Sequence, residues 1–120
     1  MLANDTDRPI PTIPPEAARV LHDGSKRLAY ALALETADRL REDPTLMLRA
    51  LAWRRRFPLA VEDDQATWLA LLEGPVDVLC RELLRLDGRG ELLRDTKPSF
   101  GAVEAGRLAA ISAAAHHAHT

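Results

Sequence analysis

The sequence predicts an all-α protein, a compact bundle of about five to seven short helices. Apolar residues make up 47% of its 120 residues, a typical value for a globular protein, whereas aromatic residues make up only 4%. The core must therefore consist mainly of Leu and Ala, which favour helices. Residues that favour strands are few, and prolines and glycines divide the chain into helix-sized segments.

The chain is short enough to form one domain. Residues 1–13 mix polar residues with prolines and show no periodicity, so we expect a flexible N-terminal arm. Residues 14–120 are expected to form a single helical domain. Because proline suits the first turn of a helix, Pro14 and Pro15 predict a short helix over 15–22 that stops at Asp23-Gly24.

The strongest amphipathic pattern predicts a helix over 26–42, with Ser25 as its N-cap. Apolar residues recur along one face at spacings of three and four: Tyr30, Ala33, Leu34, Ala37 and Leu40. Charged residues occupy another face: Glu35, Asp38, Arg39 and Glu42. We therefore expect the first face in the core and the second in solvent.

Asp43-Pro44 predicts a boundary followed by a helix over 44–56, because proline disfavours helical geometry in the residue before it. Its apolar face is expected to contain Leu46, Met47, Ala50 and Leu51, widened by Leu48, Ala52 and Trp53. Three arginines fill the last turn, where positive charge suits the helix dipole. Pro58 prevents continuation.

Two further helices are predicted around Gly74-Pro75. The first covers 64–73, is capped by Asp63 or Asp64, and points Trp68, Leu71 and Leu72 inward. The second covers 75–87. Its buried stripe is expected to comprise Val76, Leu79, Cys80, Leu83 and Leu86.

The C-terminal part is predicted to hold a short helix and a longer one. A turn at 88–90 precedes a helix over 90–95, and Pro98 fixes a loop over 97–101. The final helix, over 102–117, is rich in alanine, and Leu108 and Ile111 are its expected core contacts.

Charge and composition narrow the possible functions. A net charge of −2 argues against electrostatically driven nucleic-acid binding by the isolated chain. No segment resembles a signal peptide, and no apolar run approaches the roughly 20 residues that cross a bilayer. We therefore expect a cytoplasmic protein with no membrane partner.

No group of residues has the pattern of a catalytic or metal site. Cys80 lies on the apolar stripe, where a buried structural thiol is expected, and one cysteine forms no internal disulfide. The acids at 62–64 suit a helix start. The histidines at 116, 117 and 119 lack nearby Cys or carboxylate ligands. We predict a protein without enzymatic activity, metal or cofactor.

Two patches are candidate contact sites. Arginines lie beside aromatic residues at 49–57, a combination that contacts phosphates and stacks on bases. The nucleic-acid-binding alternative therefore uses Arg49, Arg54, Arg55 and Arg56. In the loop after Pro98, Phe100 either enters the core or faces a partner.

The order of several short motifs resembles the C-terminal domain of bacterial helix-turn-helix regulators of the antitoxin type. These motifs are Asp43-Pro44, Trp68 followed by LLEGPVDVL, Leu93-Arg94, Pro98 with Phe100 and Gly101, and Glu104 with Arg107. The likeness covers residues 28–111, and the helix-turn-helix itself is absent. The resemblance implies a helical domain that neutralises a toxin by contact. The positions that match are Trp68, Arg94, Pro98, Phe100 and Arg107.

The leading prediction is thus an antitoxin-like protein-binding module that covers a co-encoded toxin. The alternative is a transcriptional regulator that binds nucleic acid through the patch at 54–56. A homo-oligomer is compatible with either function.

Overall fold

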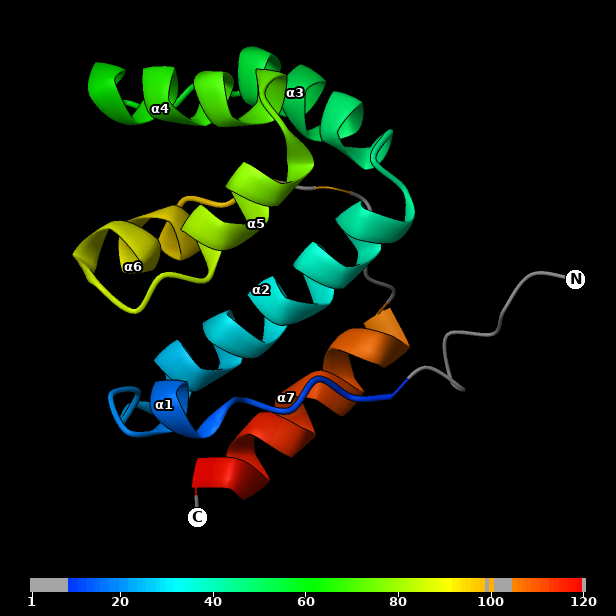
Figure 1. Cartoon of the computed structure of the whole chain (residues 1–120), viewed down its shortest axis with the longest axis vertical. Coiled ribbons are helices and arrows are strands. Elements are labelled where there is room, and N and C mark those ends of the chain that lie inside the picture. The colour runs from blue at the N-terminus through cyan, green and yellow to red at the C-terminus, as the bar shows by residue number, and fades with distance from the viewer. Residues whose placement is uncertain (1–8, 99, 101–104, 120) are drawn as a thin grey trace, which may run out of the picture.

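The computed structural model describes residues 9–98, 100 and 105–119. All regular structure within these residues is helical, which confirms the predicted fold class (Figure 1). Seven helices follow one another there: α1 (Pro15–Ala18), α2 (Gly24–Glu42), α3 (Leu46–Arg56), α4 (Glu62–Glu73), α5 (Val76–Leu83), α6 (Gly88–Asp95) and α7 (Ala105–His119).

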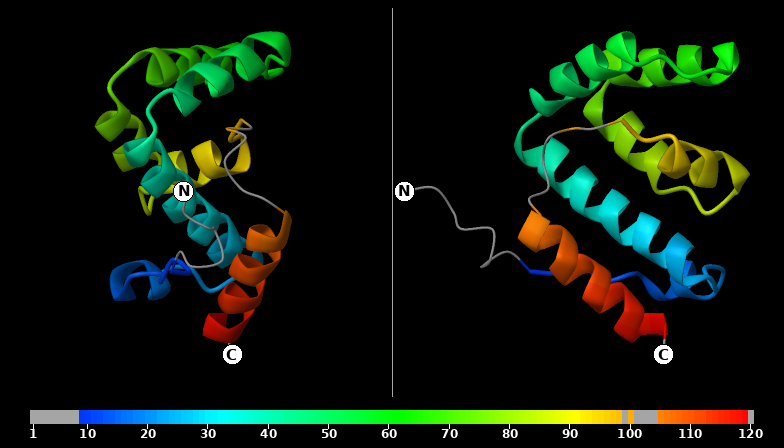
Figure 2. Two further views of the ribbon diagram at one scale, coloured as in Figure 1. Left: turned by 90° about the vertical axis from the view of Figure 1, so that its right-hand side faces the viewer. Right: turned by 180° about the vertical axis from the view of Figure 1, so that it is seen from behind.

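The long helix α2 crosses the middle of the molecule, and α7 runs antiparallel beside it (Figure 1). Helices α5 and α6 form a second pair that packs against α2. The α3–α4 hairpin lies at one end of the molecule, and α1 lies near the opposite end, beside the start of α2 (Figures 1 and 2). The two ends therefore present separate surfaces.

Helix α2 begins earlier than predicted because Asp23, and not Ser25, is its N-cap. One carboxylate oxygen of Asp23 accepts hydrogen bonds from the backbone N–H groups of Ser25, at 2.7 Å, and Lys26, at 3.3 Å. These bonds lower the pKa of Asp23. The predicted core face is confirmed, since Tyr30, Ala33, Ala37 and Leu40 are buried.

The hairpin helices also start at shifted positions. Asp43 and Pro44 form a turn ahead of α3, in which Asp43 accepts a hydrogen bond from the Thr45 backbone N–H at 3.1 Å. Helix α4 begins at Glu62, with Val61 at the N-cap position and no side-chain cap. The prediction that Asp63 or Asp64 caps this helix was therefore wrong. Both acids lie in the first turn, where the helix dipole favours negative charge.

Helix α5 ends at Leu83, four residues before the predicted end. Asp87 then caps α6 by accepting a hydrogen bond from the Gly90 N–H at 3.1 Å, so residues 88–90, predicted as a turn ahead of the helix, form its first turn. A Cβ on Gly90 would lie 2.0 Å from the carbonyl oxygen of Arg85, so this close approach requires glycine. Leu86 falls in the intervening turn and is 39% exposed, contrary to prediction.

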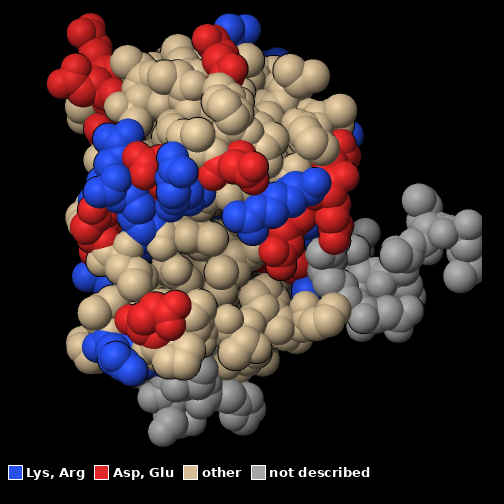
Figure 3. All heavy atoms as spheres, in the orientation of Figure 1, with Lys and Arg blue, Asp and Glu red and all other residues tan. Residues whose placement is uncertain are grey.

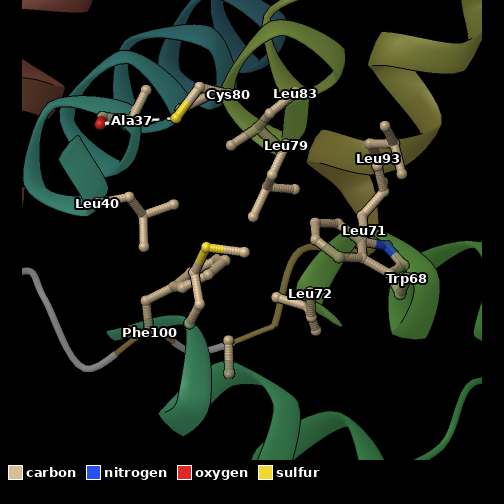
Figure 4. Packing of buried hydrophobic residues seen from close by; sticks show 13 residues of the cluster. Ala37, Leu40, Trp68, Leu71, Leu72, Leu79, Cys80, Leu83, Leu93 and Phe100 are labelled. Carbon is tan, nitrogen blue, oxygen red and sulfur yellow. Dashed lines mark hydrogen bonds between the residues drawn. The ribbon is translucent and has the colours of Figure 1, made fainter. Parts of the chain in front are cut away.

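The main core lies where α2, α4, α5 and α6 meet (Figure 4). Its largest side chain, Trp68, is fully buried together with Leu40, Leu79 and Leu83. Cys80 lies in the same layer, with its Sγ 3.7 Å from the carbonyl oxygen of Ala37. Burial raises the pKa of this thiol, as suits a packing residue.

Besides Leu86, four residues expected to be apolar core contacts are exposed. Leu48, Ala52 and Trp53 lie outside the arc of α3 that Met47 and Ala50 define. On α7, Ile111 is buried as predicted, but Leu108 is 43% exposed. The buried face of each of these two helices is therefore narrower than its apolar composition indicated.

Candidate functional site

The five positions on which the suggested resemblance to antitoxin-type domains depends are all buried. Arg94 is the most exposed of them, and only 8% of its surface is accessible. The structure places the following residues, which were predicted to bind a partner, inside the fold: Trp68, Arg94, Pro98, Phe100 and Arg107. Each is buried because helices from distant parts of the sequence converge on it.

Trp68 joins α4 to the end of α6. Its indole Nε1–H donates to the hydroxyl oxygen of Thr96 at 2.8 Å, and that hydroxyl donates to the Leu92 carbonyl at 2.8 Å. This chain satisfies the polar atom of a fully buried indole. Trp68 thus joins the hairpin to α6 and is fully buried.

Arg54 contacts the same junction from α3. Its guanidinium donates to the carbonyl oxygens of Phe57, at 3.2 Å, and Thr96. It also lies 6.0 Å from the centre of the Trp68 ring. Arg54 is only 5% exposed, and burial lowers its pKa. Arg54, which the nucleic-acid-binding alternative places on the surface with Arg55 and Arg56, therefore faces the core.

Arg94 closes the C-terminal end of α5. Its Nη1 donates to the carbonyl oxygens of Leu83, at 3.0 Å, and Arg85, at 2.6 Å. Its guanidinium lies 4.9 Å from the centre of the Tyr30 ring, whose hydroxyl donates to the Leu84 carbonyl at 3.0 Å. Burial lowers the pKa of Arg94 and raises that of Tyr30. Both side chains complete the end of a helix.

Arg107 connects α7 to α2 through Glu35. Its Nε and Nη2 donate to the two carboxylate oxygens of Glu35 at 2.9 and 3.0 Å. Nη2 also donates to the Pro9 carbonyl at 2.6 Å, and Arg39 Nε lies 3.6 Å from Glu35 Oε1. Glu35 was expected in solvent, but it is 1% exposed because α7 covers this face of α2.

Pro98 and Phe100 are both buried. Phe100 is 3% exposed and lies in the cluster that contains Leu40 and Leu72 (Figure 4). Of the two orientations left open for Phe100, the structure therefore adopts the inward one. The amine of Lys97 lies 5.7 Å from the centre of the Phe100 ring, and desolvation lowers its pKa.

Two arginines of the predicted nucleic-acid site remain on the surface without an ion pair among the described residues: Arg49 and Arg56. Arg55 is also exposed, but its guanidinium is bound to Glu73 at 2.8 Å. The sequence therefore located a basic helix, whereas the structure divides its four arginines among three environments.

Two exposed aromatic side chains accompany Arg49 and Arg56 on α3 and in the turn that follows it. Trp53 is 43% exposed and Phe57 is 48% exposed, and their ring centres are 4.7 Å apart. The Arg56 guanidinium lies 5.5 Å from the centre of the Phe57 ring. Arg49 precedes Trp53 by one helical turn, on the same side of α3. We call Arg49, Trp53, Arg56 and Phe57 the α3 outer surface.

The interior holds the α3 outer surface in place. Met47, Ala50 and Arg54 fix the opposite side of α3 in the core. Gln65, which the sequence reasoning missed, accepts a hydrogen bond from the Leu59 N–H at 2.9 Å and donates to the Arg54 carbonyl at 3.0 Å. The turn after the surface is therefore tied to α4. A glutamine in the first turns of a helix gave no sequence signal for this role.

In the part of the chain that the structure describes, no group of three His, Cys, Asp or Glu side chains is arranged to hold a metal ion. The side chains of the histidines at 116, 117 and 119 lie outside the described residues. None of the helices within the described ranges combines the length and apolar character needed to cross a bilayer.

No family model, curated protein or solved structure matches this chain. The function is therefore inferred from the residues themselves. Among the described side chains, the α3 outer surface is the arrangement that best combines exposed aromatic area with unpaired charge.

Proposed function

We propose that this chain is a non-enzymatic protein-binding module that contacts its partner through the α3 outer surface. The observation that carries the proposal is the exposed pair of Trp53 and Phe57, flanked by Arg49 and Arg56. Tryptophan and arginine dominate the binding energy of protein interfaces, and aromatic residues are enriched there. A folded domain gains little stability from leaving two contacting aromatic rings half in solvent.

The charges of this helix indicate the chemistry of the partner. Helix α3 contains no acidic residue, and its last turn contains three arginines. Carboxylates on a partner would pair with Arg49 and Arg56, while apolar side chains would cover the aromatic rings. The partner surface we propose is therefore apolar at its centre and acidic at its rim.

An antitoxin is the specific form of this proposal. The resemblance to antitoxin-type domains suggests a co-encoded bacterial toxin in the cytoplasm as the partner. Because the matching positions are buried, the contact would be made by α3 and not by those residues. Inhibition would be steric, with the rigid hairpin covering the toxin.

Nucleic acid is less suited to this surface than an acidic protein. Of the four arginines that the alternative requires, Arg54 is buried and Arg55 is paired with Glu73. The first turn of α4 carries three acids, and negative side chains gather at that end of the molecule (Figure 3). The turn after Arg56 leads directly into this acidic end, which repels phosphates.

The test is capture of a partner by the tagged full-length chain from nuclease-treated lysate of its native cells. We expect a stoichiometric protein whose capture weakens at least about tenfold in W53A/F57A, since each residue is of the type that forms interface hot spots. L92A is the matched control, because Leu92 is 43% exposed but lies on α6.

The charge component is tested with R49E/R56E and the partner purified from the wild-type capture. We expect this variant to abolish binding, whereas R19E, at an exposed arginine beside α1, leaves it unchanged. Capture that is equal in W53A/F57A and wild type, or that disappears with nuclease treatment, would overturn the proposal.

A further inference from the structure

We propose that the α3 outer surface also binds a second copy of this chain, in a symmetric dimer. This inference rests on the proposed function, because it takes the same surface as an interface and names one partner for it. The chemistry of α3 requires a partner surface with an apolar side chain next to free carboxylates. The chain carries such a surface itself, directly after the hairpin turn.

The acidic surface of the hairpin lies where α4 begins. Val61 is 56% exposed, and it is followed by the acids Glu62 and Asp63 in the first turn of the helix. Both acids are exposed, and neither forms an ion pair with a described residue. We call Val61, Glu62 and Asp63 the α4 acidic surface. It has the composition that a partner of the α3 outer surface needs.

The two charged surfaces of one copy do not neutralise each other. Neither Arg49 nor Arg56 is paired with an acid in the part of the chain that the structure describes. Gln65 fixes the turn between the two surfaces, since it binds both the Leu59 N–H and the Arg54 carbonyl. The opposite charges are therefore held in place on either side of the turn, and a second molecule can pair with them at little cost in ordering.

A two-fold axis at the turn would match these surfaces in both directions. In a symmetric dimer, a contact between one residue and another is repeated with the two copies exchanged. The basic surface of each copy then meets the acidic surface of the other, with Phe57 and Val61 near the axis. The hairpin forms one end of the molecule, so a second copy can reach the turn without meeting α1 or α7 (Figures 1 and 2). Apolar contacts at the centre and paired charges at the rim are typical of protein interfaces.

The first measurement is sedimentation equilibrium of the full-length chain at concentrations from about 10 μM to about 1 mM, which covers weak association. We expect the mass to rise from that of the 13.2 kDa monomer toward twice this value. The association should weaken at least about tenfold between roughly 0.05 and 1 M NaCl, because salt screens the charges at the rim. A wild-type chain that stays monomeric throughout would rule out the dimer.

Reciprocal charge reversal tests which surfaces meet. In R49E/R56E both surfaces are acidic, and in E62R/D63R both are basic, so each variant alone repels its own copies. We expect each to dimerise at least about a hundredfold more weakly than the wild type, because symmetry repeats every lost ion pair. An equimolar mixture should recover association, since each basic surface then meets an acidic one. Circular dichroism of each variant checks that it is folded.

Matched controls reverse charges at the other end of the molecule. E16R and R19E change exposed residues at α1 and should dimerise like the wild type. Dimerisation of R49E/R56E at wild-type strength, or failure of the two folded variants to associate when mixed, would disprove this pairing.

The dimer and the proposed function can fail separately. A monomeric chain that captures a foreign protein through Trp53 and Phe57 would retain the proposed function without the dimer. A dimer that captures no foreign protein from lysate would retain the second copy as the partner and remove the foreign one. If both associations exist, the purified foreign partner should dissociate the dimer, because the two compete for the α3 outer surface.

Discussion

The α2–α7 contact and the α3 outer surface both contain arginines, but they use them in opposite ways. Arg107 is 6% exposed, and its donors are bound to Glu35 and the Pro9 carbonyl. Arg49 and Arg56 are exposed and form no ion pair with a described residue. The neighbouring helices, and not the residue type, therefore decide whether an arginine stabilises the fold or remains accessible to a partner.

The same contrast exists within the hairpin. On the inner side of α3, Arg54 binds the Thr96 carbonyl beside the fully buried Trp68. On the outer side, Trp53 and Phe57 contact each other in solvent. Substitutions on the two sides should therefore separate stability from binding.

The largest effect is expected at the buried ion pair of the α2–α7 contact. Glu35→Ala leaves the buried Arg107 without its carboxylate and should lower the free energy of unfolding by about 3–5 kcal/mol. Urea denaturation followed by circular dichroism measures the loss.

The double variant E35L/R107L serves as the control, because it removes both charges of the Glu35–Arg107 pair and leaves Arg39 as it is in E35A. It should be more stable than E35A, since no guanidinium at position 107 remains buried. If the free energy of unfolding of E35A falls by less than about 1 kcal/mol, solvent reaches this ion pair. The Arg107 contact would then not differ from the exposed arginines of α3.

A smaller effect is expected on the inner side of the hairpin. Trp68→Phe keeps an aromatic ring but removes the donor to the Thr96 hydroxyl, which lies 2.8 Å away. We expect a loss of about 1–3 kcal/mol from the missing hydrogen bond and the smaller ring. In a double-mutant cycle with Thr96→Val, losses that are simply additive would contradict direct coupling of the two side chains.

The next effect concerns an exposed ion pair and depends on pH. Hydrogen bonds from Arg85 and from the Gly90 N–H lower the pKa of Asp87 from 3.8 to about 2. Because the folded-state pKa is depressed, the stabilisation is present above pH 4 and is lost as the pH falls toward 2. Asp87→Asn should therefore destabilise the protein at pH 6. The difference from wild type should shrink toward pH 2 in thermal unfolding.

The smallest effect on stability is expected at the α3 outer surface. The double variant R49A/R56A should change the free energy of unfolding by no more than about 0.5 kcal/mol, because neither arginine has an ion-pair partner among the described residues. Urea denaturation of R49A/R56A and of E35A under the same conditions compares the two losses of stability. A loss approaching that of E35A would show that these arginines belong to the fold.

Periodicity predicted the helices and much of the core because the spacing of apolar residues is a local property. It identified the buried stripe of Leu79, Cys80 and Leu83. The same periodicity also indicates that Arg54 is buried, although the sequence analysis placed this arginine on the surface. Met47, Ala50 and Arg54 follow at intervals of three and four, which places this arginine on the buried side of α3. Its partner, Thr96, lies 42 residues away, so no local pattern specified the contact.

The candidate site could be predicted only in part. The sequence indicated that arginines and aromatic residues share α3, but their exposure depends on how the hairpin packs. Glu35 was misplaced for the same reason, since a carboxylate on a polar face becomes buried only when α7 covers it. Helix ends were displaced where single hydrogen bonds, such as those to Asp23, outweighed the apolar pattern.

The hydrogen bond from Arg54 to the Thr96 carbonyl orders α3 before any partner binds. It ties the middle of α3 to a segment beyond α6, and Gln65 secures the turn that follows. Trp53 and Phe57 are thus held on a helix whose backbone is already ordered before any encounter. A complex formed on this face loses little conformational freedom in the module itself, so its lifetime should depend mainly on the contacts that the partner supplies.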